Sequence, residues 1–274
     1  MFILFNGKII RREEWLPNAL LLGKPFLLEE TVWFASGALP LFRNHLERLE
    51  ARCQQLNLPP PKELAHPQEL HRLSTRLINK NKAFMGGWLH YSFFRNAERY
   101  DSLVVCRPCP TREFPMEAAG LLATISGEIK FSRTPAASFL VSSKLLWESE
   151  RLRLAGSRYS EAVFCNEQGV VTEATGGNIF CLTGNSLVTP ATETGCVADP
   201  LRQVVLQAAV AAGLQVLESA KISPEELSQM EEIFIASEAE GVRWILGVEA
   251  KRFVKTKTEI LYRQLDRLLT EKIS

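Results

Sequence analysis

The sequence lacks the features that mark membrane proteins and nucleic-acid-binding proteins. No apolar run approaches the ~20 residues that a membrane-spanning helix needs. The 32 lysines and arginines are balanced by 31 aspartates and glutamates, which leaves a formal net charge of +1 and no basic stripe. A nucleic-acid-binding surface would concentrate positive charge. We therefore expect neither a membrane nor a nucleic acid as a partner.

The sequence also lacks a secretory leader. Its opening, MFILFNGKII, is apolar only briefly and has neither a basic segment nor a small-residue cleavage site. The apolar residues around Asn6-Gly7 instead predict a strand followed by a tight turn. Without a leader, the expected location is the reducing cytoplasm.

The six cysteines do not form a metal-binding pattern. Cys106 and Cys109 make a single CxxC motif, and a zinc site of this type needs a second pair or histidines at ligand spacing, which the sequence does not offer. We interpret both cysteines as small apolar residues near the end of a strand, and we expect no metal.

The first part of the chain predicts a small α+β domain. Leucines at helical spacing predict an amphipathic helix over 41–58, which ends at three prolines, and a second helix over 67–80. The β-rich runs 87–95 and 102–106 come next and predict a hairpin of an antiparallel sheet.

A proline-rich stretch, 107-RPCPTREFP-115, predicts the domain boundary, with one domain over 1–115 and a larger one over 116–274. The second domain contains short strands that lie close together in the sequence, separated by glycine turns. Such strands are too close together for a doubly wound sheet, so the sequence predicts an α+β fold. Helices are predicted over about 138–155, 200–213 and 256–273.

Three residues are candidates for chemistry, and each also has a plain structural explanation. Lys144 lies among apolar residues, where burial would lower its pKa and free its amine, but it could also be a solvated helix lysine. Glu173 precedes Gly176-Gly177, where backbone can approach a ligand closely, but it could also be an edge glutamate. Arg48 could hold a phosphate through two parallel bonds or pair with a neighbouring glutamate.

A lysine for an aldehyde, a carboxylate for a pyridine nitrogen and a basic residue for a phosphate together form the set that pyridoxal 5'-phosphate (PLP) requires. The chain resembles the fold-type IV PLP enzymes, which include branched-chain and D-amino-acid aminotransferases and aminodeoxychorismate lyase. The most specific segment is 161-EAVFCNEQGVVTEATGGNIFCLTGNSLVTP-190, and 45-HLERL-49 also fits. The resemblance extends over nearly the whole chain.

The resemblance implies a two-domain fold with a smaller N-terminal α/β sandwich and a larger β-barrel-like C-terminal domain carrying helices. It implies PLP as the cofactor, a small-molecule amino substrate and a homodimer. Arg48 matches the arginine that binds the phosphate, and Glu173 matches the carboxylate that pairs with the ring nitrogen. Arg202 matches the arginine that opens the next helix, and Ser237 matches a residue near the phosphate.

The catalytic lysine implied by the resemblance is Lys144. The segment that carries it aligns with the lysine-bearing segment of the family if about one helical turn is deleted before Glu161. Lys130 is the other candidate, but it lies farther upstream than the family spacing predicts.

Two segments depart from the family pattern. The stretch 23-GKPFLLEET-31 lacks the aspartate, the second glycine and the aromatic residue that the family pattern has at its own fixed positions. The phosphate-binding turn reads 197-VADPLR-202, in which Pro200 removes an N–H donor and Asp199 adds a negative charge. Phosphate affinity should therefore be lower, unless a neighbouring amide such as that of Leu201 compensates.

The compact length of the chain favours aminodeoxychorismate lyase, which releases pyruvate to form 4-aminobenzoate, a folate precursor. The alternative within the family is a class IV aminotransferase for branched-chain or D-amino acids. A third possibility is a cofactor-free, non-catalytic homologue, which the altered phosphate turn motivates. Glu29, Arg95 and Arg243 are candidates for substrate contacts, but they match no subgroup.

Overall fold

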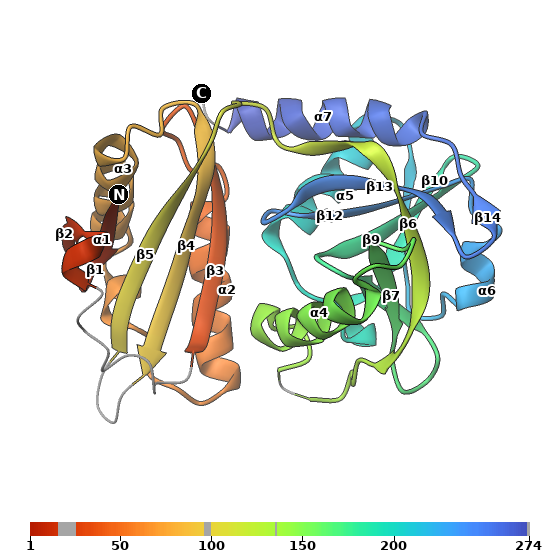
Figure 1. Cartoon of the computed structure of the whole chain (residues 1–274), viewed down its shortest axis with the longest axis horizontal. Coiled ribbons are helices and arrows are strands. Elements are labelled where there is room, and N and C mark those ends of the chain that lie inside the picture. Colours follow the sequence, from red (N-terminus) through yellow and green to blue (C-terminus); the bar gives the residue numbers. More distant parts are fainter. Residues whose placement is uncertain (16–25, 96–99, 135, 273–274) are drawn as a thin grey trace. The chain divides into compact units, whose positions relative to one another are not determined.

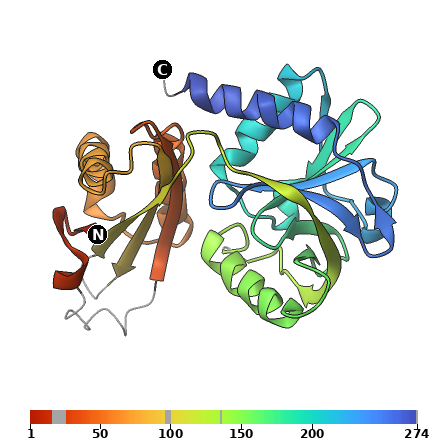
Figure 2. The same cartoon turned by 45° about the horizontal axis from the view of Figure 1, so that its top comes forward.

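The computed structural model describes residues 1–15, 26–95, 100–134 and 136–272. The chain divides into two compact units (Figures 1 and 2). Unit 1 is Met1–Glu113 together with the C-terminal Lys272, and unit 2 is Phe114–Glu271. The division falls two residues before the domain boundary predicted at 115/116. Within the described residues, no helix is long and apolar enough to cross a membrane.

Unit 1 contains a five-stranded sheet in the order β2-β1-β5-β4-β3, in which every neighbouring pair is antiparallel. Asn6 and Gly7 both have positive φ, 46° and 80°, as the two-residue turn of a hairpin requires. The predicted opening turn is therefore confirmed. The strands are β1 (Phe2–Phe5), β2 (Lys8–Arg11), β3 (Phe26–Ala35), β4 (Gly86–Arg95) and β5 (Tyr100–Cys109).

Helices α2 (Phe42–Gln55) and α3 (Pro67–Lys80) cover one face of this sheet (Figure 1). Their apolar residues, including Leu46, Leu49 and Leu77, form one core with the inward residues of β3, β4 and β5. The boundaries predicted for α3 are those observed, because Pro67 occupies its first turn. Unit 1 also contains the short helix α1 (Arg12–Trp15) and a 3₁₀ turn at Lys62–Ala65. A second 3₁₀ turn, Thr192–Thr194, belongs to unit 2.

Unit 2 contains a mixed sheet in the order β11-β10-β9-β12-β13-β6-β7-β8, with β14 paired to β13. The sheet curls, and an isolated bridge between Ala174 and Gly177 joins the end of β8 to the start of β9. The strands are β6 (Met116–Ile129), β7 (Glu161–Cys165), β8 (Val171–Ala174), β9 (Asn178–Thr183), β10 (Ser186–Pro190), β11 (Gln215–Ser219), β12 (Glu232–Ser237), β13 (Gly241–Val248) and β14 (Lys251–Arg252).

The helices of unit 2 are α4 (Leu140–Leu154), α5 (Pro200–Ala211), α6 (Pro224–Leu227) and α7 (Lys257–Glu271). Helix α7 packs against α5 and β12, and Leu261, Leu265 and Leu269 form its buried stripe. A core of aliphatic side chains, including Ile179 and Ile235, fills one side of the sheet. On the opposite side, Phe180 and Phe234 stack with ring centroids 5.0 Å apart. The two-domain α+β fold expected from the sequence is confirmed.

Candidate functional site

Glu173 is the centre of a buried polar cluster in unit 2. It lies on β8, where Phe164 of β7 is its paired residue, and its side chain has no solvent exposure. Its carboxylate accepts hydrogen bonds from Lys130 Nζ, from Trp147 Nε1 at 2.9 Å and from the Val197 amide at 2.7 Å. Three donors therefore satisfy the hydrogen-bonding capacity of this buried carboxylate.

Lys130 is the lysine that contacts Glu173. It directly follows β6, and its amide donates to the Cys165 carbonyl at 3.0 Å, which continues the parallel pairing of β6 with β7. Its side chain is 5% exposed, and Nζ also donates to Ser143 Oγ at 2.6 Å. The amine is therefore held between a carboxylate and a hydroxyl.

Lys144, the lysine implied by the family spacing, lies on α4 one residue after Ser143 and is partly exposed. On the same helix, Ser143 contacts Lys130 and Trp147 contacts Glu173. Lys130 reaches this cluster because β6 ends beside β7, a pairing that sequence spacing does not reveal. The structure thus brings Glu173 into contact with Lys130, although Lys144 fits the family spacing better.

The amine–carboxylate pair of Lys130 and Glu173 fits the ring end of PLP. A buried carboxylate can keep a pyridine nitrogen protonated, and a nearby lysine can react with the aldehyde carbon. Here the two groups compensate each other's charge. The amide nitrogen and oxygen of Asn178, 1% exposed, are buried without a hydrogen-bond partner among the described residues. Such orphaned atoms are common at ligand sites.

In the turn where the resemblance places the phosphate, the Asp199 carboxylate binds backbone amides of the chain itself. Asp199 is the N-cap of α5, and its Oδ1 accepts from the Leu201 amide at 2.7 Å. Its Oδ2 accepts from the Glu238 amide at 3.5 Å, just beyond Ser237 at the end of β12. The Leu201 amide, which was expected to compensate for Pro200, therefore already has an anionic partner.

Arg202 and Ser237 also make their contacts within the protein. The Arg202 guanidinium donates to Thr189 Oγ1, to the Pro190 carbonyl and to Glu218, all at 2.6–2.8 Å. Ser237 Oγ accepts from the Glu240 amide at 3.2 Å. Arg202 therefore ties α5 to β10 and β11, which is a structural role.

In unit 1, Arg48 forms an ion pair with Glu30 of β3. Arg52 Nη1 reaches the same carboxylate at 2.6 Å, and His45 Nδ1 lies 2.6 Å from it. Burial alone would raise the pKa of Glu30, but Arg48, Arg52 and His45 together lower it far below its usual range. The cluster therefore holds an ionised carboxylate among basic groups.

Two other candidates, Glu29 and Arg95, also belong to unit 1. Glu29 is half-buried, and its carbonyl accepts from Arg52 Nη1 at 3.4 Å. Arg95 ends β4 and is partly exposed. The departure from the family pattern noted at residues 23–31 begins outside the described residues.

Arg243, the third candidate for a substrate contact, belongs to an ionic cluster on β13. Its guanidinium donates to Glu161 and to the Thr175 carbonyl, and it pairs with Glu240 at 2.9 Å. Burial raises the pKa of Glu161 to about 7, against the opposing effect of Arg243. Arg151 of α4 also pairs with Glu240. Arg243 thus supports the loop after Glu173.

The glycine bend after Glu173 packs against protein atoms. Gly176 has φ +81°, and a Cβ there would collide with Arg243 and Glu240. A Cβ on Gly177 would lie 2.6 Å from the Ala236 carbonyl oxygen. The glycines are therefore needed for contacts with β12, with Arg243 and with Glu240.

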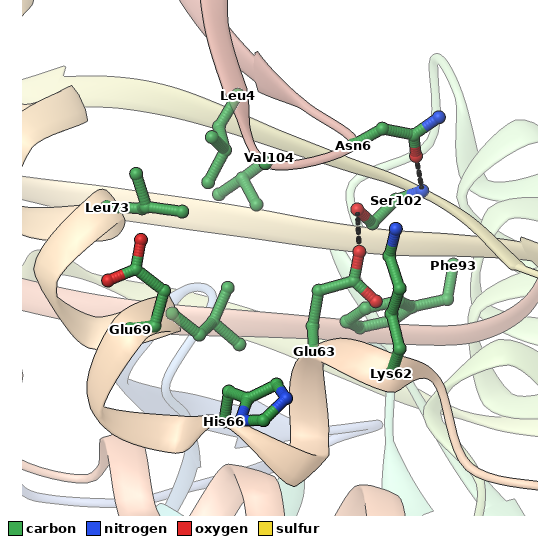
Figure 3. A pocket seen from close by; sticks show the side chains of 12 residues that line it. Leu4, Asn6, Lys62, Glu63, His66, Glu69, Leu73, Phe93, Ser102 and Val104 are labelled. Carbon is green, nitrogen blue, oxygen red and sulfur yellow. Dashed lines mark hydrogen bonds between the residues drawn. The ribbon is translucent and has the colours of Figure 1, made fainter.

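The cavities among the described residues include one beside the Lys130–Glu173 cluster and one in unit 1. One of about 390 Å³ includes Lys130 in its wall, together with the mainly apolar side chains of Ile129, Phe131, Thr134, Ala137, Leu145, Leu146 and Ser149. The other, of about 210 Å³, belongs to unit 1, where Glu63, His66 and Glu69 lie on one side and Leu4 and Val104 of the sheet on the other (Figure 3). The predicted site residues lie outside the second cavity.

The cysteines form no metal centre within the described residues, where no three His, Cys, Asp or Glu side chains are grouped for a metal. Cys106 lies on β5, and burial raises its thiol pKa to about 11. Cys109 ends the same strand. These positions agree with the prediction of cysteines near the end of a strand.

Comparisons with known proteins give two kinds of likeness. A branched-chain-amino-acid aminotransferase from Arabidopsis thaliana is 32% identical over 103 residues, 38% of this chain and 25% of that protein. A probable branched-chain-amino-acid aminotransferase from Synechocystis is 30% identical over 34% of this chain and 30% of its own length. The chain therefore matches less than a third of either curated relative.

Solved structures cover far more of the chain at lower identity. A branched-chain aminotransferase from Thermoproteus uzoniensis superposes with a TM-score of 0.82 at 20% identity, over 99% of this chain and 95% of that chain. A Legionella pneumophila protein described as a candidate 4-amino-4-deoxychorismate lyase has a TM-score of 0.74 at 18% identity, over 93% of each chain. These likenesses show the fold.

The profile of the Amino-transferase class IV family matches residues 28–247, which include most of β3, the Lys130–Glu173 cluster and the Asp199 turn. A structure of a branched-chain aminotransferase from Thermobaculum terrenum in its PLP form has the same fold, with a TM-score of 0.80 at 19% identity, over 99% of this chain and 93% of that chain. The chain belongs to the class IV aminotransferase family of PLP-dependent enzymes.

Proposed function

We propose that this chain is a PLP-dependent aminotransferase for amino acids with apolar side chains. The observation that carries the proposal is the buried contact between Lys130 and Glu173, which supplies the amine and the carboxylate that PLP chemistry needs. The mainly apolar cavity beside Lys130 supports an apolar side chain on the substrate, as do the branched-chain aminotransferases among the relatives.

Each group of the cluster has a distinct role in this proposal. When bound, PLP supplies the aldehyde carbon and an electron-withdrawing ring. Lys130 Nζ would hold the aldehyde end of the cofactor and would move the proton at the substrate Cα. Glu173 would hold the ring nitrogen in its protonated form. Trp147 and the Val197 amide fix the Glu173 carboxylate, and Ser143 orients Lys130.

Aminodeoxychorismate lyase is the second candidate, supported by the candidate lyase among the solved structures. The same lysine and carboxylate serve both reactions, since each begins with loss of the substrate Cα proton. The two reactions differ in their later steps, because the lyase releases pyruvate from one substrate and the aminotransferase passes the amino group to a second oxo acid. Product analysis separates them.

The choice of lysine is tested first. Protein incubated with PLP is reduced with borohydride, digested and analysed by mass spectrometry to find the modified residue. We expect the label on Lys130, and Lys130→Ala to abolish labelling and turnover. Lys144→Ala is the matched control on α4 and should keep both. A label on Lys144 would instead show that Lys144, the residue implied by the family spacing, is the lysine that bonds to the cofactor.

The reaction itself is tested by product analysis. Purified protein with PLP is incubated with 2-oxoglutarate and a panel of L- and D-amino acids, and separately with aminodeoxychorismate. Glutamate formed from apolar amino acids supports the aminotransferase, and 4-aminobenzoate supports the lyase. Labelled protein that forms neither product would favour a non-catalytic homologue. A homodimer, also part of the proposal, is tested by sedimentation at micromolar concentration.

A further inference from the structure

We propose that the Asp199 carboxylate takes the place of the cofactor's phosphate, so that this chain binds unphosphorylated pyridoxal at least as tightly as PLP. The inference rests on the proposed function, because the same amine, Lys130, would bond to either aldehyde. It concerns the end of the site away from the Lys130–Glu173 pair. Its basis is a set of contacts in unit 2 in which Asp199 already binds the backbone amides that a phosphate would need at the turn before α5.

The first contact is at the N-terminus of α5. A helix of 12 residues presents unpaired amides and a partial positive charge at this end, which suits an anion. In this chain the anion is built in, because Asp199 Oδ1 accepts from the Leu201 amide at 2.7 Å. Pro200, the first helical residue, has no N–H to offer. The Leu201 amide therefore already has an anionic partner, and Pro200 adds no donor.

The second contact comes from a separate segment, the end of β12. The resemblance assigned both this segment and the α5 turn to the phosphate. The structure joins them through Asp199 itself, whose Oδ2 accepts from the Glu238 amide at 3.5 Å. One carboxylate thus bridges the two places where phosphate oxygens were expected to bind.

The charges at this junction oppose a phosphate. Asp199 is 8% exposed, so its carboxylate is an acidic group already buried at this junction. A phosphate ester would bring up to two further negative charges into the same low-dielectric region. The nearby guanidinium of Arg202 is directed to Thr189, Pro190 and Glu218.

A neutral hydroxymethyl group suits the junction better than a phosphate. Asn178 pairs with Ala236, two residues before Glu238, and both polar atoms of its buried amide lack a partner among the described residues. An amide can donate to a hydroxyl and accept from it without adding charge. Pyridoxal carries a hydroxyl at the position where PLP carries phosphate, so the site needs no anion receptor to hold it.

The test compares the two aldehydes on the same protein. The ε-amine of Lys130 adds to the aldehyde carbon and one water leaves; borohydride then delivers hydride to the resulting C=N bond, and intact mass reports the adduct. Dissociation constants for pyridoxal and for PLP are measured by absorbance titration. In the wild-type protein we expect the pyridoxal constant to be equal to or lower than the PLP constant. Inorganic phosphate should not displace pyridoxal.

The decisive variant is Asp199→Asn, because asparagine is as good an N-cap as aspartate and preserves the fold while removing the charge. The ratio of PLP affinity to pyridoxal affinity should rise by about tenfold or more. Glu249→Gln is the matched control: Glu249 is also an acidic residue of unit 2 that accepts from a backbone amide, that of Ile125. It should leave the ratio unchanged.

The outcomes separate this inference from the proposed function. A wild-type preference for PLP of about tenfold or more, or an unchanged ratio in Asp199→Asn, overturns the inference while turnover can still support the function. A pyridoxal adduct without turnover on any substrate supports the inference and removes the aminotransferase. The absence of an adduct with either aldehyde removes both.

Discussion

The ammonium of Lys130 and the carboxylate of Glu173 form a direct, buried ion pair in unit 2. Lys130 comes from the end of β6 and Glu173 from β8, 43 positions further along the chain, so the pair depends on the pairing of both strands with β7. Solvent compensates neither charge appreciably. The free energy of unfolding should therefore respond strongly when only one partner is changed.

Glu173→Gln should lower the free energy of unfolding by about 3–5 kcal/mol, because it leaves the buried ammonium of Lys130 without a counterion. Urea denaturation measures the change. The double variant Glu173→Gln with Lys130→Met removes both charges and should recover much of the loss. Equal destabilisation of the single and double variants would contradict the pair's role.

The same Glu173→Gln change should reduce turnover much more than cofactor occupancy. The amide keeps the shape of the carboxylate but cannot carry the charge that holds a proton on the ring nitrogen. Occupancy is read by borohydride trapping and turnover by product formation under saturating cofactor. Wild-type turnover in this variant would remove Glu173 from the assigned role.

Glu161 should give unit 2 a stability that falls as the pH rises. Burial raises its folded-state pKa from 4.5 to about 7, so the folded state binds the proton more tightly than the unfolded state. Its stabilising contribution is fully present below pH 4.5 and is lost as the pH rises through about 7. A difference of one pKa unit corresponds to ~1.4 kcal/mol, so the contribution is on the order of 3 kcal/mol.

Denaturation of the wild-type protein and of Glu161→Gln between pH 4.5 and about 7 checks this prediction. The variant retains an acceptor for Arg243 but cannot titrate. It should lose less stability over this window than the wild type does. Parallel pH profiles for the two proteins would show that Glu161 keeps an ordinary pKa.

Glu30→Gln should destabilise unit 1 by about 3 kcal/mol or more, since the buried carboxylate is shared by Arg48, Arg52 and His45. Glu47→Gln is the matched control, because Glu47 pairs with Arg43 on the exposed face of α2 and should cost no more than about 1 kcal/mol. Thermal unfolding of the two variants measures the contrast. Similar losses would mean that the Glu30 cluster is weak.

Gly177→Ala should destabilise the protein by about 1–3 kcal/mol, because its Cβ would lie 2.6 Å from the Ala236 carbonyl oxygen and force β9 away from β12. Gly127→Ala is the control: a Cβ at this position meets no atom within 4 Å. The control should be neutral or slightly stabilising. Urea denaturation of both proteins checks the difference, and equal stability of both would show that β9 and β12 can separate at no cost.

Local signals predict most of the helices and hairpins. The boundaries predicted for helix α3, 67–80, are those observed, because a proline and an amphipathic pattern define it. Strand β13, Gly241–Val248, is not predicted. Its pairing with β6 shifts register twice, so its side chains do not alternate regularly between buried and exposed positions. Periodicity alone could not reveal such a strand.

The site was predictable in its chemistry but only partly in its geometry. Glu173 stands out through a local sequence pattern, and the structure places it at the centre of the buried cluster. Which lysine reaches it depends on where β6 ends and on its pairing with β7, which are non-local facts. Likewise, the acidic character of the α5 turn is visible in the sequence, whereas the bridge from Asp199 to the Glu238 amide is not.

Helix α4 couples the two halves of the ion pair mechanically. Ser143 and Trp147 are one helical turn apart; the first contacts Lys130 and the second contacts Glu173. A ligand that entered between the amine and the carboxylate would lengthen the distance that this single turn bridges. Loading of the site and the order of α4 are therefore linked, and hydrogen exchange along α4 would register the arrival of a ligand without any view of the ligand itself.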